Sequence, residues 1–374
     1  MRLSDIGELA LLEIIRKRFA RKSMVRTRQK GIIVDIGDDA AVIKPRAKKL
    51  LITTDMMVER VHFDLSFTTP YQLGFKLVSV NASDIYAMGG TPHYLLLDIA
   101  MNKTTEESFV NSFFDGIQDA IKLYGISLIG GDLSSSKDDM VAAASLIGYA
   151  EKPVKRSGAK PGDKIYVTGS PGDSACGLEL LKKAVSCQSP HSPQRTRLSA
   201  GATRRGEPSA ISKKLNAESY SLNAKYKKTG LTWNTIAPLL KRHLMPEARN
   251  PKNFVRHATA MLDLSDGLFI DLSRLCNESK TGARIYIEHI PVSSQAKEAS
   301  SALGLDLFKL ATSGGEDYEL LFTAPPDYKP RAMSHELKIT CIGDITKKGM
   351  VAVDKYGKES ALKAEGYQHY GIQR

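Results

Sequence analysis

Apolar residues recur with a helical period near the start of the chain. Between residues 5 and 19, Leu11, Ile15 and Phe19 follow one another at intervals of four, with further apolar residues beside them. This spacing places them on one side of a helix, so it predicts an amphipathic first helix.

Capping signals predict two further helices. Thr69 followed by Pro70 supplies a side chain that can cap a helix and a residue that suits its first turn. Thr104 and Glu107 have the spacing of a capping box, which predicts a helix over 105 to 124.

Short apolar runs that end at acidic or glycine-containing turns predict strands between these helices. In the first 150 residues the runs are 34 to 43 (VDIGDDAAVI), 50 to 55 (LLITTD), 94 to 100, 126 to 132 and 140 to 150. Because strands and helices alternate, this part of the chain is predicted to form one α/β or α+β domain.

A turn-rich segment, KRSGAKPGD at 155 to 163, separates this domain from a second. A strand (KIYVTGS), a glycine-containing loop and a helix through LELLKKA follow it, and regular alternation of helices and strands is predicted to resume at about 236 and to continue to 343. Residues 186 to 230 are rich in Ser, Lys, Arg, Asn and Gly with little apolar periodicity, so they are predicted to be a disordered basic insertion. We therefore expect domains over 1 to 150 and 151 to 374.

The charge of the chain is concentrated in two stretches. The formal net charge is +12. Residues 16 to 30 contribute +8 and residues 186 to 230 contribute +7, so the remainder carries about −3. Neither stretch has interleaved aromatic residues or a nucleic-acid-binding motif, which favours solvated loops over a nucleic-acid site.

Nothing in the sequence resembles a membrane span or a secretory leader. No run approaches eighteen apolar residues, and acids interrupt the first fifteen. The cysteines form no CxxC pair, which is typical of a reducing compartment, and the prediction is a cytoplasmic protein. They are Cys176, Cys187, Cys276 and Cys341.

Acidic residues recur where an apolar segment meets a turn. They are Asp38, Asp39, Asp55, Asp84, Asp132, Asp263 and Asp266. A single aspartate after a strand is commonly a turn former or a helix cap, but side chains at several strand ends can converge on one cleft. Such carboxylates would repel one another unless cations bound among them, and the absence of nearby His or Cys favours Mg²⁺. The pattern therefore predicts a magnesium and polyphosphate site.

Other nucleotide chemistries lack their motifs. The sequence has no GxxxxGK[ST] loop, no GxGxxG that opens a helix and no HRD or DFG motif, and it also lacks GxSxG. These absences argue against a P-loop enzyme, a dehydrogenase of Rossmann type, a protein kinase and a serine hydrolase.

Nine motifs in chain order resemble those of the bacterial thiamine-monophosphate kinase family. They are GDDAAV (37 to 42), TTDMMVERVHF (53 to 63), VNASDIYAMGG (80 to 90), LIGGD (128 to 132), RSGAKPGD (156 to 163), VTGSPGDSACGL (167 to 178), KRHLMPE (241 to 247), DLSDGL (263 to 268) and SGGEDYELLF (313 to 322). The resemblance spans nearly the whole chain apart from the insertion.

The resemblance implies a two-domain fold of the aminoimidazole ribonucleotide synthetase type. In it the N-terminal domain binds ATP and Mg²⁺ and forms a sheet or barrel across a homodimer, and the C-terminal domain is α/β. The implied reaction transfers a phosphoryl group from ATP to thiamine monophosphate, giving thiamine diphosphate, with several Mg²⁺ ions and with neither membrane nor nucleic acid as a partner.

The resemblance also implies residue roles. The implied metal ligands are Asp39, Thr53, Thr54, Asp55, Asp84, Asp132, Asp263 and Asp266. The implied ATP contacts are Gly131, Asp132, Arg156 and Ser265, and the implied thiamine-phosphate contacts are His62, Glu316 and Tyr367. The acceptor is a phosphate oxygen that is already anionic, so no general base is expected, and alignment, metal ions and the Arg156 charge are expected to suffice.

Departures and alternatives accompany the resemblance. Arg60 stands where the family usually has glycine, two residues before His62. The nearest alternative is another ATP-dependent synthetase of the same superfamily, although the reactive cysteines of selenophosphate synthetase and of the hydrogenase maturation dehydratase have no counterpart. A nucleic-acid-binding protein that uses the two basic stretches is a further alternative, and its affinity would fall steeply with salt.

Overall fold

The computed structural model describes residues 2–6, 8–20, 31–34, 40–186, 230–330 and 337–367. The chain divides into two compact units, the first formed by residues 1–155 and 247–256 and the second by residues 156–246 and 257–374. The predicted insertion falls almost entirely on residues 187–229, which lie outside the described residues, as do Asp38 and Asp39.

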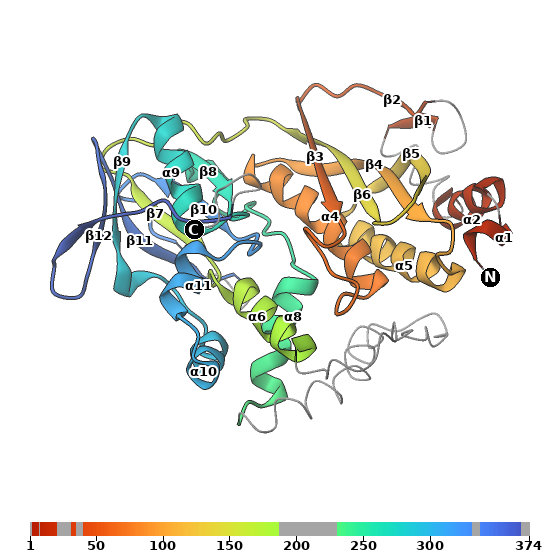
Figure 1. The fold of residues 1–374 in the computed structure, drawn as a ribbon. Helices are drawn as coiled ribbons and strands as arrows, with labels where there is room; N and C mark the ends of the chain where they lie inside the picture. Colours follow the sequence, from red (N-terminus) through yellow and green to blue (C-terminus); the bar gives the residue numbers. More distant parts are fainter. Residues whose placement is uncertain are drawn as a thin grey trace. The chain divides into compact units, whose positions relative to one another are not determined.

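The first unit is built on a four-stranded sheet with strand order β3-β6-β4-β5. Its strands are β3 (Lys49–Val58), β4 (Thr91–Asn102), β5 (Ser127–Ser136) and β6 (Val141–Ala150). Strand β4 runs parallel to β5 and antiparallel to β6. A two-stranded sheet of β1 (Ile32–Val34) and β2 (Val42–Ile43) accompanies it, together with the N-terminal helices α1 (Leu3–Ile6) and α2 (Glu8–Ala20). Helix α2 matches the predicted first helix, and β3 to β6 match four of the five predicted strands (Figure 1). The fifth, predicted over 34 to 43, is a strand only at 34 and 42–43, and residues 35–39 lie outside the described part of the chain.

Helix α4 (Pro70–Ala87) lies between this sheet and helix α5 (Glu107–Tyr124) (Figure 1). The predicted cap is confirmed, since the Thr69 hydroxyl accepts the Gln72 N–H at 3.3 Å and the Gln72 side chain accepts the Thr69 N–H at 2.9 Å. Two glycines allow the helices to approach closely: a Cβ on Gly74 would lie 2.1 Å from the Phe113 carbonyl oxygen, and one on Gly116 would lie 1.9 Å from that of Tyr71. Any side chain at either position would force the helices apart.

The predicted cap of α5 is wrong, although the helix itself is present. Its N-cap is Glu106, which makes no side-chain capping bond. Thr104 instead donates its N–H and its hydroxyl to the Asn102 carboxamide oxygen, at 2.9 and 2.7 Å. The side chain that was expected to cap the helix therefore closes the turn before it.

The second unit contains a seven-stranded sheet with order β13-β12-β9-β11-β7-β10-β8. Its strands are β7 (Lys164–Thr168), β8 (Ala260–Asp263), β9 (Gly282–Tyr286), β10 (Leu320–Ala324), β11 (Ile339–Thr346), β12 (Met350–Val353) and β13 (Glu359–Ala361). Its helices are α6 (Asp173–Ser186), α8 (Trp233–Leu244), α9 (Leu268–Ser279), α10 (Ser294–Leu303) and α11 (Leu307–Ser313), with short 3-10 turns η2 (Val255–His257), at the boundary between the units, and η3 (Ile287–His289).

Alternation along the strands builds the core of the second unit. Ile165 and Val167 on β7, Leu262 on β8 and Leu321 on β10 point to the same side of the sheet and pack with apolar residues of α9. The stacked rings of Tyr166 and Phe322, with centroids 5.2 Å apart, come from the intervening positions. Side chains of these strands thus pack on both faces of the sheet.

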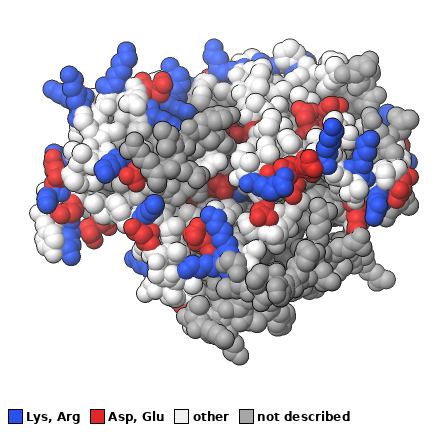
Figure 2. Space-filling view, in the orientation of Figure 1, with Lys and Arg blue, Asp and Glu red and all other residues white. Residues whose placement is uncertain are grey.

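None of the helices in the described part of the chain combines the length and the apolar character needed to cross a bilayer. On the face of the molecule that Figure 2 shows, basic and acidic side chains are interspersed over the described residues, and no broad basic area appears there.

Candidate functional site

Three of the predicted metal ligands, Thr53, Asp55 and Asp84, meet in the first unit. Thr53 and Asp55 occupy alternate positions of β3 together with buried Met57, on the side of the sheet that faces α4. Asp84 lies on α4, and its carboxylate accepts the Thr53 hydroxyl. Burial, and secondly the nearby charge of Asp84, raise the pKa of Asp55 to about 7. The structure therefore brings these two carboxylates close enough to repel each other.

Thr54 and Asp132 belong to the opposite side of the same sheet. The Thr54 hydroxyl donates to the Ala144 carbonyl oxygen at 3.1 Å. The strand register places Asp132 opposite Asp98, and Asp98 opposite Ala143. The predicted acids in the described part of this unit, together with Asp98, thus form two groups, Asp55 with Asp84 and Asp98 with Asp132. Asp98 was not singled out in the sequence because it lies inside an apolar strand run instead of at its end.

Gly131 could not be another residue at its place in β5. Its φ is 147°, and a Cβ would lie 1.9 Å from the Leu97 carbonyl oxygen of the neighbouring strand. The GGD motif therefore has a structural requirement for glycine, and the backbone here is open to close approach.

The oxygen donors of the first unit suit magnesium. Within the described ranges there is no group of three or more His, Cys, Asp or Glu side chains that could hold a metal ion by itself. Asp55, Asp84 and the Thr53 hydroxyl supply oxygen ligands only, and Mg²⁺ is commonly held by one or two carboxylates with substrate phosphates completing its shell. Asp39, a further implied ligand, lies among the residues that are not described.

The predicted substrate histidine lies in the turn after β3. The Val58 N–H donates to His62 Nδ1 at 3.0 Å, so the proton of the neutral ring is on Nε2. Arg60 has a left-handed backbone, with φ of 65°, and forms an ion pair with Asp139. This conformation favours glycine, so Arg60 occupies a backbone position that a side chain rarely adopts.

In the second unit the DLSDG loop follows β8. Asp263 is the last residue of that strand and is buried. Arg274 donates to the Asp266 carboxylate at 2.5 Å and to that of Asp271 at 2.7 Å. Asp271 also accepts the N–H groups of Asp266 and Gly267, and burial raises its pKa. The Asp266 carboxylate thus has a cationic partner on the following helix.

A second loop, residues 314 to 319, lies against the first. The Glu316 N–H donates to the Ser265 carbonyl oxygen at 2.7 Å, and the Tyr318 N–H donates to that of Leu264 at 2.8 Å. The Tyr367 N–H donates to the Asp266 carbonyl oxygen at 3.0 Å. Ser265, Glu316 and Tyr367, which are far apart in the sequence, therefore belong to one cluster of loops.

Buried charges that the sequence analysis did not identify support this second loop. Asp317 accepts the N–H groups of Gly172 and Ser174, at 2.6 and 3.1 Å, and burial raises its pKa to about 8. Arg242 donates to the Asp317 carbonyl oxygen at 2.6 Å and forms an ion pair with Glu319. The motifs PGDS, KRH, DLSDG and SGGED thus converge on one region of this unit. These residues belong to motifs that were identified in the sequence, but nothing in the motifs indicated which of their polar side chains would support a loop.

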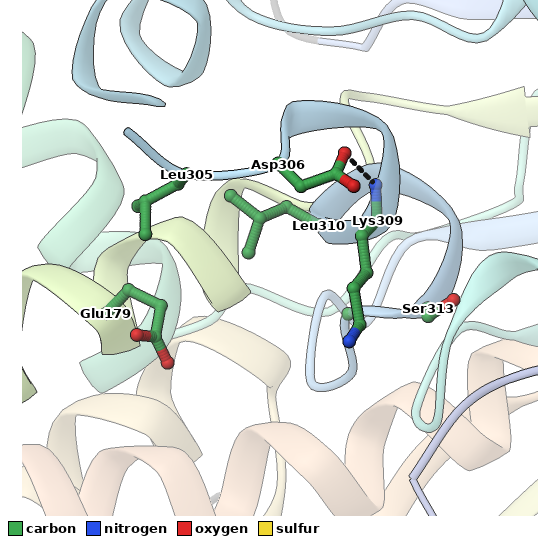
Figure 3. A pocket seen from close by; sticks show the side chains of 7 residues that line it. Glu179, Leu305, Asp306, Lys309, Leu310 and Ser313 are labelled. Carbon is green, nitrogen blue, oxygen red and sulfur yellow. Dashed lines mark hydrogen bonds between the residues drawn. The ribbon is translucent and has the colours of Figure 1, made fainter. Parts of the chain in front are cut away.

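A cavity of about 300 Å³ ends at the start of the same loop. Figure 3 shows Glu179, Asp306, Lys309 and Ser313 among its lining side chains. Glu179 forms an ion pair with Lys182, and Asp306 caps α11 by accepting the Lys309 N–H at 3.0 Å. Both carboxylates already have partners, so the cavity gives no specific indication of a ligand.

Arg156, the predicted cation over the phosphates, is exposed at the start of the second unit. Its carbonyl oxygen accepts the Ser279 hydroxyl at 3.1 Å, and the same hydroxyl accepts the N–H groups of Gly158 and Ala159. The backbone of the RSGAKPGD segment is therefore fixed to the end of α9.

Comparison with known proteins first defines a class. Residues 37–150 match the model of the AIR synthase related protein, N-terminal domain, and residues 235–355 match that of the AIR synthase related protein, C-terminal domain. The chain is thus an AIR-synthase-related protein with two α/β domains, as the motifs predicted.

Full-length relatives then identify the family. The chain is 32% identical over 372 residues to the thiamine-monophosphate kinase of Aquifex aeolicus, covering 99% of this chain and 100% of that one. It is 33% identical over 358 residues to that of Escherichia coli strain K12, covering 92% and 94%. A solved structure described as AaThiL complexed with AMPPCP and TMP has a TM-score of 0.67 and 30% identity, covering 99% of each chain. This chain belongs to the thiamine-monophosphate kinase family.

Proposed function

We propose that this protein transfers the γ-phosphoryl group of ATP to the phosphate of thiamine monophosphate, forming thiamine diphosphate and ADP. The full-length similarity to the family is the observation that carries the proposal. The group of Thr53, Asp55 and Asp84 in the first unit and the cluster of loops in the second unit support it, because each gathers residues that the family motifs supply from distant parts of the sequence.

In this proposal the residues keep the roles implied by the family motifs. The metal ligands are Asp39, Thr53, Thr54, Asp55, Asp84, Asp132, Asp263 and Asp266. The ATP contacts are Gly131, Asp132, Arg156 and Ser265, and the thiamine-phosphate contacts are His62, Glu316 and Tyr367. The oxygen donors at Thr53, Asp55 and Asp84 support the Mg²⁺ assignment most directly. Bound Mg²⁺ would neutralise phosphate charge.

The side chains themselves position and compensate charge. The neutral His62 ring presents an Nε2–H donor because Nδ1 accepts a backbone N–H. Arg156 supplies a fixed cation to the phosphates, and no residue is required to remove a proton because the attacking phosphate oxygen is already anionic. Transfer is therefore direct, without a phosphorylated enzyme.

The proposal includes a homodimer. β3 is an edge strand of its sheet, and its side chains at Leu50, Ile52 and Met56 are 52%, 68% and 59% exposed. Exposed apolar side chains on an edge strand are a typical surface for association, and a second copy would also cover the open strand edge. We place the enzyme in the cytoplasm, where ATP is available.

Turnover of purified protein with ATP, Mg²⁺ and thiamine monophosphate tests the reaction, with thiamine diphosphate measured by chromatography. Asp84→Asn, which keeps the shape of the side chain and removes its charge, is the matched control and should yield little product. Folded wild-type protein that forms no thiamine diphosphate would refute the proposed function.

A further inference from the structure

The loop from 314 to 319 has a backbone that needs support. Glu316 and Tyr318 have φ values of 63° and 50°, in the left-handed region that side chains rarely adopt. Non-glycine residues in this region persist where surrounding contacts fix them, and they are frequent at ligand sites.

Backbone hydrogen bonds fix the path of the loop but do not determine where the Glu316 carboxylate points. The side chain of Glu316 is 29% exposed, so it reaches the surface of the unit. His243, the neighbour of Arg242 on α8, has its Nδ1 atom 3.4 Å from Glu316 Oε2. The same Nδ1 lies 3.2 Å from the Ser174 hydroxyl oxygen. The His243 side chain is 5% exposed, so water hardly competes for these contacts.

The chemistry of these groups indicates which of them donates. An ionised carboxylate only accepts hydrogen bonds, so Nδ1 must carry a proton to be attracted to Glu316. A hydroxyl oxygen can accept a share of the same proton, so a protonated Nδ1 is compatible with both contacts. Helix α8 therefore supports the loop twice, through Arg242 at the Asp317 carbonyl and through His243 at the Glu316 carboxylate.

We propose that His243 is a positioning residue that aims the Glu316 carboxylate at thiamine monophosphate. This inference rests on the proposed function for the identity of the ligand. The part of the inference that concerns structure, namely that His243 restrains loop 314 to 319, does not depend on the proposed function. His243 itself contacts no reacting atom in this proposal.

Two substitutions of His243 separate its hydrogen bond from its volume. His243→Leu fills similar space without a donor, and His243→Asn places an amide nitrogen close to the position of Nδ1. For His243→Leu we expect the KM for thiamine monophosphate to rise about tenfold, the size of one lost hydrogen bond to a charged group, with kcat within about twofold of wild type. His243→Asn should restore most of the affinity. His289→Leu, at an exposed histidine of the same unit, is the matched control and should change neither constant.

Hydrogen–deuterium exchange of the peptide spanning 314 to 319 tests the structural half without substrate. His243→Leu should exchange faster there than wild type, while His243→Asn should not. Wild-type exchange and wild-type KM in His243→Leu would overturn the inference.

If wild-type protein does not phosphorylate thiamine monophosphate, the proposed function fails while the exchange result still decides the role of His243. Should His243→Leu fold poorly, His243→Asn is compared with His243→Gln, whose amide lies one bond farther out. Equal KM values for these two would also overturn the inference.

Discussion

Replacing Arg242 by methionine would leave a buried carboxylate without its cationic partner. Arg242 and Glu319 have side-chain exposures of 12% and 1%, so water reaches the pair poorly. Methionine occupies much of the same volume without charge. The Glu319 carboxylate would retain one strong donor, the Thr168 hydroxyl at 2.6 Å, but would lose its counter-ion.

The structure allows the size of this effect to be estimated. Breaking a buried ion pair by removing one partner costs about 3–5 kcal/mol of unfolding free energy. Because the Thr168 hydroxyl still compensates the remaining charge, we expect a loss of about 3 kcal/mol. With a urea dependence of about 2 kcal/mol per molar, the midpoint should fall by roughly 1.5 M. Arg242→Met together with Glu319→Gln should recover at least half of that loss, because no unpaired charge remains.

The single tryptophan of the chain provides the assay. Trp233 begins α8, the helix that carries Arg242, so its fluorescence during urea titration reports on this unit. Arg242→Lys, which keeps the charge but not the two-pronged geometry, should lie between wild type and Arg242→Met. A loss below about 1 kcal/mol for Arg242→Met, or a double variant as unstable as the sum of the single ones, would refute the reasoning.

Three other perturbations test the first unit. Gly116→Ala would drive a Cβ into a backbone carbonyl of α4 and should lower the unfolding free energy by about 3 kcal/mol or more, measured by thermal unfolding; unchanged stability would contradict the helix crossing. Because the pKa of Asp55 in the folded state is raised to about 7, the folded protein binds an extra proton between about pH 4 and 7, so without metal its unfolding free energy should fall as pH rises through that window. Asp55→Asn should remove this dependence and abolish turnover, whereas full turnover would exclude Asp55 from the site, and Asp84→Asn should reduce turnover likewise. Arg60→Gly would relieve a left-handed side chain at the expense of the Asp139 ion pair, and we expect the melting temperature to move by less than 3 °C, within about ±0.5 kcal/mol; a larger drop would show that the ion pair matters for stability.

Local signals in the sequence predicted helices α2, α4, α5 and α6 and strands β3 to β7, whereas the later elements of the second unit were predicted only as a regular alternation. Thr69 caps α4 as expected because its partner at the third helical position, Gln72, is a local neighbour. Thr104 was not predicted correctly. Its side chain could either cap the helix or bond within the preceding turn, and in the structure it bonds to Asn102. Such competition depends on the geometry of a few residues and is not visible in spacing.

The residues of the candidate site could be predicted from the sequence better than their arrangement in space. Asp55 and Asp84 are neighbours as expected, but the expected reason is wrong, because Asp55 lies inside β3 and Asp84 lies inside α4 instead of at the end of an element. The side of the sheet to which Asp132 belongs depends on strand register, which a one-residue shift reverses. The partners of Asp266 and Glu319 could not be predicted, because Arg274 follows on a helix face and Arg242 arrives from a distant helix. Residues 247–256 belong to the first unit, and their composition did not indicate this.

The sheet order of the second unit has a consequence for how this unit folds. Strand β7 is the first of its strands to be synthesised, yet both of its neighbours, β10 and β11, follow more than 150 residues later. The middle of the sheet therefore cannot assemble until nearly the whole chain has left the ribosome, and such distant pairings are slow to form. The cost of closing so long a loop grows only with the logarithm of its length, so the chain between α6 and α8 can be extended by tens of residues for a few tenths of a kcal/mol. Natural selection can thus lengthen this connection almost without penalty.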